Sequence, residues 1–410
     1  MDKLIKGLKV LLGIVGVVFW AASQFWGIIL VLLAMGLQIF ENFRKLDREE
    51  ALGKLKEMGI TALYPTIGIA AALLIGGIIM ALSGYNPFTA YGAMFYGGLI
   101  KNWHVSLLNA TPLIFTGLSI AVAFKAGLFN IGAEGQYYIG SMIATWLAIR
   151  FSLPLGLYIP IIFILAGTCA AAYNIIPTWL KIRTGAHEVV TTMMFAHIAR
   201  IFSTIFVRNN GGDPATSTHA YTTDAILEAN EILPLKNLIA GANYRVHTGV
   251  LLAFAVAVFI WYLLYKTRIG YEIRAVGENQ IAAKTQGINA SRSIMIAMLI
   301  AGFLCGMSGT TQVLGLEHKM YENLNAGYGW NGIAVALLAN NDPVGVVFAA
   351  LLWGLLDAGG QYMARTTQTP SAIIEIIKGT ILFLILAKYI YFWFGQKLFK
   401  GSKKTAGEAA

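Results

Sequence analysis

The segment from Ala126 to Gln136 gathers polar side chains that could line a path for a solute. Asn130, Glu134 and Gln136 lie between two apolar stretches, and an ionised acid facing lipid near the bilayer centre costs about 2.5–3.5 kcal/mol. These side chains must therefore face protein, water or the membrane interface. The three glycines of the segment let another backbone approach, and a broken helix with polar groups is typical of a transport path. Alternatively, Lys125 and Glu134 lie near the interface and tie helices together.

A second polar segment runs from Tyr265 to Arg292. Within it, Asn279–Gln286 is expected to form a short helix, with Gly287 as its left-handed stop. Ala282 and Ala283 leave one face of this helix small, so the helix could dock into a groove of another protein. The five basic residues of the segment also suit a plain cytoplasmic loop near anionic lipid. Its length and its small-residue helix favour docking.

Other residues have both a functional and a structural interpretation. His187 and Glu188 open a helix, where they could gate a pore or cap the helix near its end. Thr192 could line a polar face or bond back to its own helix, which is the commoner case. Trp330 and Asn331 lie at the Gly-rich start of a helix, where an aromatic ring could stack on a base or sugar. Interfacial anchoring is the commoner role of such a tryptophan.

Motifs for catalysis, metals and cofactors are missing from the sequence. It contains no G-x-x-x-x-G-K-[ST] phosphate loop, so the chain is not expected to hydrolyse ATP itself. It contains no HExxH and no G-x-S-x-G motif, and its two cysteines lie in apolar runs without metal-ligand spacing. We therefore predict no catalytic residue, no metal site and no bound cofactor in this chain. The net charge of +10 is not arranged as a basic stripe, so nucleic-acid binding is not expected.

The composition points to helices that cross a membrane. The chain has 410 residues, of which 57% are hydrophobic and 12% charged, whereas about a quarter of the residues of a soluble domain are charged. The apolar residues form runs of about 17–25, the length of a helix that crosses a hydrocarbon core of about 30 Å. The runs lack the alternation of apolar and polar residues that the strands of a membrane β-barrel show. The sequence therefore predicts an all-α polytopic membrane protein.

Charge and run length predict twelve crossings with both termini in the cytoplasm. The stretch Ile5–Phe40 has basic residues at both ends and is predicted to be a membrane hairpin. Ten further crossings are predicted at Ile60–Leu82, Leu107–Phe124, Leu128–Ile149, Leu155–Leu180, Val189–Val207, Val250–Tyr265, Ile294–Leu316, Gly329–Leu338, Val344–Leu356 and Ile373–Tyr391. This topology places 19 of the 30 basic residues inside and seven outside, as the positive-inside rule requires.

Two stretches are predicted to lie outside. Tyr85–Trp103 is apolar, Gly-rich and interrupted by Pro87, and a re-entrant segment is the alternative there. The longest outside loop, Asn209–Asn243, is polar. It is either a docking surface for an external partner or a solvated loop with a short helix at Asp224–Glu231.

Several stretches of the sequence resemble the permeases of bacterial ABC importers for nucleosides and simple sugars. The longest matching string is ATPLIFTGLSIAVAFKAGLFNIGAEGQ (Ala110–Gln136). Others are SGYNPFTAYGAMFYG (Ser83–Gly97), GAHEVVTTMM (Gly185–Met194), RAVGENQIAAKTQGI (Arg274–Ile288) and GWNGIAVALLANNDPVG (Gly329–Gly345). The resemblance covers roughly residues 60–391 and identifies the chain as a member of the branched-chain amino acid/ribose-type permease superfamily, in its nucleoside branch.

The resemblance implies a ten-helix permease core with a cytoplasmic coupling loop between its sixth and seventh helices. Counted from Ile60, the second polar segment lies at that place. The expected organisation is an N-terminal membrane hairpin and linker (residues 1–58), a permease core (residues 59–395) and a basic cytoplasmic tail (residues 396–410). The hairpin departs from the family pattern, and the sequence assigns it no role.

The resemblance also implies partners and roles for individual residues. A separate cytoplasmic ATPase would bind ATP and Mg, a second permease subunit, for which the family favours a non-identical chain, would complete the pore, and a solute-binding protein or lipoprotein would deliver substrate from outside. The residues expected to contact the ATPase are Gly277, Glu278, Asn279, Ala282, Ala283 and Gly287. The candidates for the translocation path are Asn130, Glu134, Gln136, Glu188, Thr192, Trp330 and Asn331.

The function expected from the resemblance is ATP-driven import of nucleosides across a bacterial cell membrane. Purine nucleosides such as guanosine are the expected substrates, and simple sugars are the alternative. A different class, an ion- or proton-coupled secondary transporter, would need intramembrane carboxylates that titrate, such as Glu134, Glu188 or Asp357.

Overall fold

A computed structural model describes residues 66–151, 155–211, 221–234, 246–322 and 327–386 of the chain. The predicted hairpin at Ile5–Phe40, the linker up to residue 58 and the tail after residue 395 lie outside these residues. The described residues are mostly helical and contain no strand, only isolated β-bridges. The predicted all-α class is confirmed.

Contacts divide the chain into two units, and the first contains residues 1–96, 239–242 and 363–410. Its described helices are Thr66–Leu82, α4 (Pro87–Tyr96) and α16 (Ala372–Leu386). At Gly76 the first of these helices packs closely against α16: a methyl group added at this Cα would lie only 2.5 Å from Ile377. Small residues allow such close approach where no hydrophobic effect drives helices together.

The second unit contains residues 97–238 and 243–362. Its longer elements are α5 (Trp103–Lys125), α6 (Ala133–Arg150), α7 (Leu155–Tyr173), α8 (Ile175–Thr184), α9 (Glu188–Asn209), α10 (Gly249–Lys266), α11 (Arg268–Glu278), α12 (Gln280–Thr285), α13 (Ala290–Gln312), α14 (Tyr328–Leu338) and α15 (Pro343–Thr367, up to Tyr362). Two π-helical turns, Gly97–Lys101 and Val313–Glu317, precede α5 and follow α13. The stretch Tyr85–Trp103 is thus largely helical.

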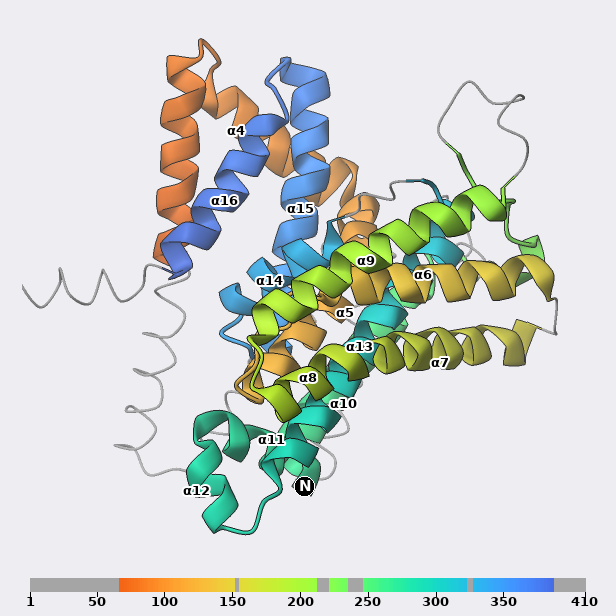
Figure 1. Ribbon diagram of the computed structural model, residues 1–410. Helices are drawn as coiled ribbons and strands as arrows, with labels where there is room; N and C mark the ends of the chain where they lie inside the picture. The colour runs from red at the N-terminus through yellow and green to blue at the C-terminus, as the bar shows by residue number, and fades with distance from the viewer. Residues whose placement is uncertain (1–65, 152–154, 212–220, 235–245, 323–326, 387–410) are drawn as a thin grey trace, which may run out of the picture. The chain divides into compact units, whose positions relative to one another are not determined.

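Helix α13 is the centre of the second unit. It packs against α5, α6 and α7 (Figure 1). A methyl group on Gly140 of α6 would overlap the backbone of Gly306 in α13, and one on Gly306 would overlap the backbone of α7. Most residues of α5 are also buried, on every side of the helix, as expected for an apolar helix in the middle of a bundle.

Part of the predicted outside loop is ordered along the end of α13. The backbone N–H groups of Thr223, Ile226 and Ile232 each donate to a carbonyl in residues 314–320, at 2.9 Å. One of the two interpretations of this loop included a short helix at Asp224–Glu231, and the structure has a single 3₁₀ turn at Glu228–Asn230 there. The backbone pairs with the chain beside it, so a longer helix is not needed to satisfy these groups.

Six helical segments in the described residues are long and apolar enough to cross a membrane. They are Trp103–Lys125, Tyr158–Thr184, Glu188–Asn209, Gly249–Lys266, Ala290–Glu317 and Pro343–Thr367. Thr66–Leu82 and Tyr328–Leu338 are shorter apolar helices. The polytopic architecture is confirmed, and the count of twelve crossings stays a prediction.

Candidate functional site

Helices α11 and α12 form a capped pair at the end of the second unit next to α10 (Figure 1). Asn279 lies between them in extended conformation, and its Oδ1 accepts hydrogen bonds from the backbone N–H groups of Ile281 (2.9 Å) and Ala282 (3.0 Å). This satisfies two of the free donors at the start of α12. Gly287 has φ +79 and stops the helix in the left-handed conformation. The short helix predicted at Asn279–Gln286 is confirmed.

The six residues expected to contact an ATPase differ in their exposure. Four of them are exposed, namely Glu278, Asn279, Ala282 and Gly287, and Gly277 is half-buried. Ala283 is only 4% exposed. Its methyl group packs into the core of its own chain, so direct contact of Ala283 with another protein does not fit the structure. It anchors α12 instead.

The end of α11 lies directly on the turn between α5 and α6. Gly127, in that turn, has φ +76, and a methyl group on its Cα would lie 3.2 Å from the Cα of Gly277. A methyl group on Gly277 would overlap the carbonyl oxygen of Lys125. The two backbones therefore meet with no room for a side chain. We call this contact the Gly127–Gly277 junction.

A hydrophobic cluster holds the junction together. Leu128 packs in one cluster with Val276 of α11 and Ala283 of α12, and residues of α5 and α13 complete it. Leu128 is 3% exposed. The first polar segment is thus joined through Leu128 and Gly127 to the exposed pair α11–α12.

Beyond the junction, the polar side chains of the first segment are buried and bonded to protein. Asn130 and Gln136 exchange two hydrogen bonds, from Nδ2 to Oε1 (3.0 Å) and from Nε2 to Oδ1 (3.1 Å). Glu134 Oε2 accepts a hydrogen bond of 2.6 Å from the backbone N–H of Gly329. All three side chains are at most 4% exposed. They face protein, one of the environments expected from the cost of exposing them to lipid.

The bond to Gly329 places Glu134 at the N-terminus of α14. A carboxylate at that end of a helix accepts a hydrogen bond from a free N–H group and interacts favourably with the positive end of the helix dipole. A methyl group on Gly329 would overlap the backbone of Glu134, so α14 begins in direct contact with the start of α6. Glu134 therefore connects these two helices.

Two buried oxygen atoms beside this contact have no hydrogen-bond partner within the described part of the chain. They are Glu134 Oε1 and the hydroxyl of Tyr137. The ring of Tyr137 lies 5.9 Å from the ring of Tyr138 and 5.9 Å from that of Tyr328, measured between centroids. Buried polar atoms are seldom left unpaired, so this aromatic cluster offers acceptor and donor atoms to water or to a polar solute. The tyrosines that follow Gln136 were the only signal of it in the sequence.

Helix α9 packs tightly on the start of α6. A methyl group on Gly132 would lie 3.1 Å from the Cβ of Thr192, and one on Gly135 would lie 2.6 Å from the Cα of Ala196. The hydroxyl of Thr192 donates to the carbonyl of Glu188 at 2.7 Å, which is the back-bonding alternative expected of such a threonine.

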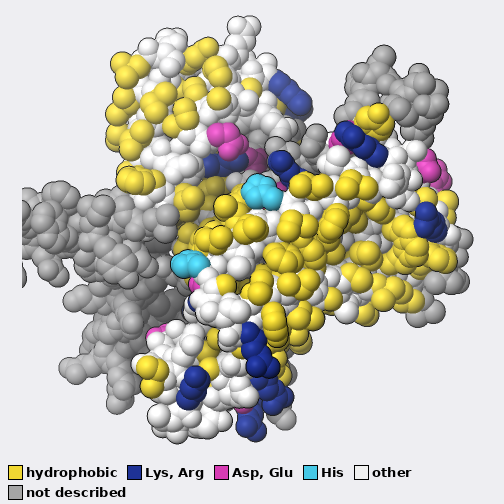
Figure 2. Space-filling view, in the orientation of Figure 1, with side chains coloured by type: hydrophobic (Ala, Val, Ile, Leu, Met, Phe, Trp, Pro, Cys, Tyr) yellow, Lys and Arg dark blue, Asp and Glu magenta, His cyan; other side chains and the backbone are white. Residues whose placement is uncertain are grey.

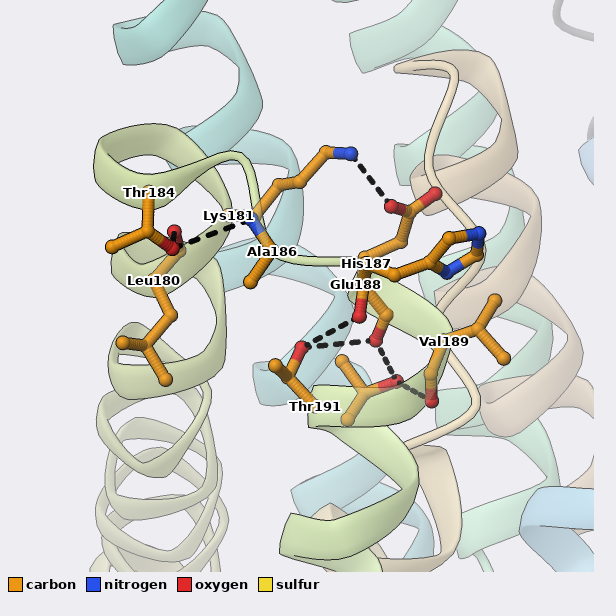
Figure 3. A network of polar contacts seen from close by, with 9 residues as sticks. Leu180, Lys181, Thr184, Ala186, His187, Glu188, Val189 and Thr191 are labelled. Atoms are coloured by element: carbon orange, nitrogen blue, oxygen red, sulfur yellow. Dashed lines mark hydrogen bonds and ion pairs between the residues drawn. The ribbon is translucent and has the colours of Figure 1, made fainter.

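Glu188 is bonded at the turn between α8 and α9. Figure 3 shows its carboxylate facing Lys181, with 2.8 Å between Nζ and Oε2. His187 is the N-cap residue of α9, but its side chain makes no capping hydrogen bond. Both Glu188 and Thr192 therefore serve local structure, and a role in a transport path stays a prediction for them.

Trp330 and Asn331 lie in the first turn of α14, after Gly329. The Trp330 side chain is 43% exposed, and Asn331 is half-buried. The hydrogen bond from Gly329 to Glu134 places this turn close to Glu134 in space, and a role in a transport path stays a prediction for both residues. Within the described residues, no group of three or more His, Cys, Asp or Glu could hold a metal ion.

Comparison with known proteins finds a matching family and several characterised relatives. The family described as branched-chain amino acid transport system / permease component matches residues 102–386. The Guanosine ABC transporter permease protein NupP of Bacillus subtilis is 35% identical over 344 residues, which is 83% of this chain and 97% of that protein. The Nucleoside ABC transporter permease protein NupB of Lactococcus lactis is 34% identical, over 80% of this chain and 91% of its own.

A glucose ABC transporter permease of Haloferax volcanii is 32% identical, over 79% of this chain and 87% of its own. Bacillus subtilis and Lactococcus lactis each have a second permease that also matches, at 28% and 26% identity. No solved structure matches the chain significantly.

Proposed function

This chain belongs to the family of branched-chain amino acid transport system permease components, and from that membership we propose that it is the permease subunit of an ABC importer for nucleosides. Two relatives that match over most of the chain are named for guanosine and nucleoside transport. Guanosine is the substrate that we propose first. The relative named for glucose makes a simple sugar the second candidate.

The observation that carries the mechanism is the Gly127–Gly277 junction. It joins a surface that another protein can reach, α11–α12, to a buried polar segment in the middle of the bundle. In the proposed cycle, ATP closes the ATPase and moves α11–α12. The junction and Leu128 pass this movement to α6 and, through Glu134, to α14. Coupling requires an element whose position differs between two states, and in this proposal the close backbone contact carries the movement of α11–α12 to the buried segment.

The proposed complex contains other subunits. A cytoplasmic ATPase binds ATP and Mg and supplies the hydrolysis, and a solute-binding protein or lipoprotein delivers the substrate. A second, non-identical permease completes the pore, which the pairs of matching permeases in two bacteria support. In this arrangement both termini and α11–α12 lie in the cytoplasm of a bacterial cell.

The substrate is tested by uptake into proteoliposomes that contain the complete importer and internal ATP. We expect radiolabelled guanosine to accumulate and an excess of unlabelled adenosine to compete with it, while glucose does not. Accumulation of glucose without competition by nucleosides would replace the proposed substrate by a sugar. Accumulation that continues without ATP and stops when the proton gradient is removed would overturn the ABC mechanism itself.

The coupling role of α11–α12 is tested at Gly287. This residue is exposed, with open space where a side chain would lie, so Gly287→Arg adds a long cation to the surface. Gly287→Asn is the matched control, since asparagine tolerates the left-handed conformation. We expect Gly287→Arg to abolish guanosine-stimulated ATP hydrolysis in an assembled importer, and Gly287→Asn to keep it. Equal stimulation in both variants would refute docking at this surface.

A further inference from the structure

An apolar groove lies on the second unit between α7, α10 and α13. Its volume is about 520 Å³, and its open side is not closed by any described residue. The lining includes Ala172 of α7, Phe259 and Leu263 of α10, and Ile300 and Phe303 of α13. Apart from Thr168, every lining residue is hydrophobic. The three helices belong to segments that are long and apolar enough to cross a membrane, and an apolar groove among them suits a hydrocarbon chain.

Two cations lie at one end of the helices that line the groove. Lys266 follows the lining residue Leu263 by three positions, and Arg292 precedes Leu299 by seven. Residues three, four or seven apart share one face of a helix, so the backbone positions of both residues continue the lined faces. Both are exposed. They flank α11–α12, at the end of the bundle that the topology prediction places in the cytoplasm.

The surroundings of Lys266 indicate the depth of a membrane interface. Its ammonium lies 5.9 Å from the ring centroid of Trp261, and two tyrosines, Tyr262 and Tyr265, stand between them in the sequence. Tryptophan and tyrosine gather where hydrocarbon meets headgroups. Figure 2 shows a broad hydrophobic face that ends in a group of Lys and Arg side chains near α11. A phospholipid site needs an apolar groove for an acyl chain and cations at its end for the phosphate, and both features are present here.

We propose that the groove binds one anionic phospholipid, with an acyl chain between α7, α10 and α13 and its phosphate at Lys266 and Arg292. The chemistry of the walls excludes a nucleoside, because a groove with almost no polar lining would leave its hydroxyls and base edges unpaired. Basic pockets between helices on the cytoplasmic side suit anionic headgroups. The lipid bridges α10 and α13, the two helices that hold α11–α12.

The site is tested by native mass spectrometry of the assembled importer purified in a mild detergent, with phosphatidylglycerol and phosphatidylcholine added in equal amounts. We expect the wild-type chain to retain phosphatidylglycerol preferentially. The double variant Lys266→Gln/Arg292→Gln should lose about 25-fold in this preference, since each cation near a headgroup contributes about fivefold. Arg268→Gln is the matched control: Arg268 is exposed but paired with Glu272 at 3.0 Å, and its removal should leave the preference unchanged.

The groove itself is tested by filling it. Ala172 is exposed and lines the groove, so Ala172→Phe should reduce retention of both lipids without a loss of folding. Cys169→Phe adds the same ring at an exposed position of α7 that is not in the lining and should have no effect. An unchanged preference in the double variant, or equal retention in the two phenylalanine variants, overturns the proposal. A third outcome also overturns it. If Ala172→Phe breaks the subunit complex without changing the amount of bound lipid, a second permease subunit covers the groove.

Discussion

The two polar segments of this chain look similar in sequence, but they differ in what their side chains bond. In residues 126–136, Asn130, Glu134 and Gln136 are buried and bonded to protein groups. In residues 277–287, the polar side chains are exposed, and Asn279 bonds only the start of its own helix. The first segment therefore stabilises the bundle, and the second is free to meet another protein. Substitutions should lower stability in the first and spare it in the second.

The largest expected effect is at Glu134. Replacing it with alanine leaves the Gly329 N–H buried without an acceptor and removes a hydrogen bond of 2.6 Å. We expect Glu134→Ala to lower the free energy of unfolding by about 3 kcal/mol. Thermal unfolding of the purified full-length chain, followed by tryptophan fluorescence, measures this loss.

Glu188→Ala is the control for Glu134→Ala. Its ion pair with Lys181 is partly exposed, and such pairs contribute about 1 kcal/mol or less. If both variants lowered the free energy of unfolding equally, Glu134 would not hold α14. The buried carboxylate would then contribute no more than the partly exposed one.

The next effect is at the junction. Gly277→Ala forces a methyl group against the carbonyl of Lys125, and overpacking of this kind costs about 1–3 kcal/mol. Gly379→Ala is the matched control, because nothing lies within 4 Å of the added methyl group, and alanine is the better helix former. The midpoint of thermal unfolding should fall for Gly277→Ala only. A midpoint unchanged by Gly277→Ala would show that the two backbones do not meet.

A smaller effect is expected from the reciprocal bond between Asn130 and Gln136. A double-mutant cycle with Asn130→Ala and Gln136→Ala should give a coupling of about 1 kcal/mol, because either single change already breaks both hydrogen bonds. The free energies of unfolding of the four proteins supply the measurement. Strictly additive losses would mean that the two amides do not pair.

The smallest effect on stability is expected in α12. Ala282 is exposed, so Ala282→Arg should change the free energy of unfolding by about 0.5 kcal/mol or less. Guanosine-stimulated ATP hydrolysis by the assembled importer should nevertheless fall by about tenfold or more, because the new side chain disturbs a coupling contact. Ser291→Arg adds the same charge at an exposed position in the first turn of α13 and should keep the stimulation. Full activity of Ala282→Arg would remove α12 from the coupling surface.

The sequence predicted the all-α polytopic class because the length and composition of an apolar run are local properties. It also predicted α12, since the Asn279 cap and the Gly287 stop lie within a few residues of the helix. The contact between Gly127 and Gly277 joins positions 150 residues apart, and a glycine does not say which backbone it faces. For the same reason, the bond from Glu134 to Gly329 and the burial of Ala283 were not predictable from residue type.

In the proposed importer, α11–α12 and the buried segment 126–136 move together when the ATPase binds ATP. Hydrogen–deuterium exchange of the assembled importer, with and without a non-hydrolysable ATP analogue, tests it directly. If the Gly127–Gly277 junction transmits movement, the analogue should change exchange in residues 277–287 and in residues 126–136 together, and Gly277→Ala should confine the change to the first range. A change limited to residues 277–287 in the unaltered importer would show that the junction does not transmit the movement.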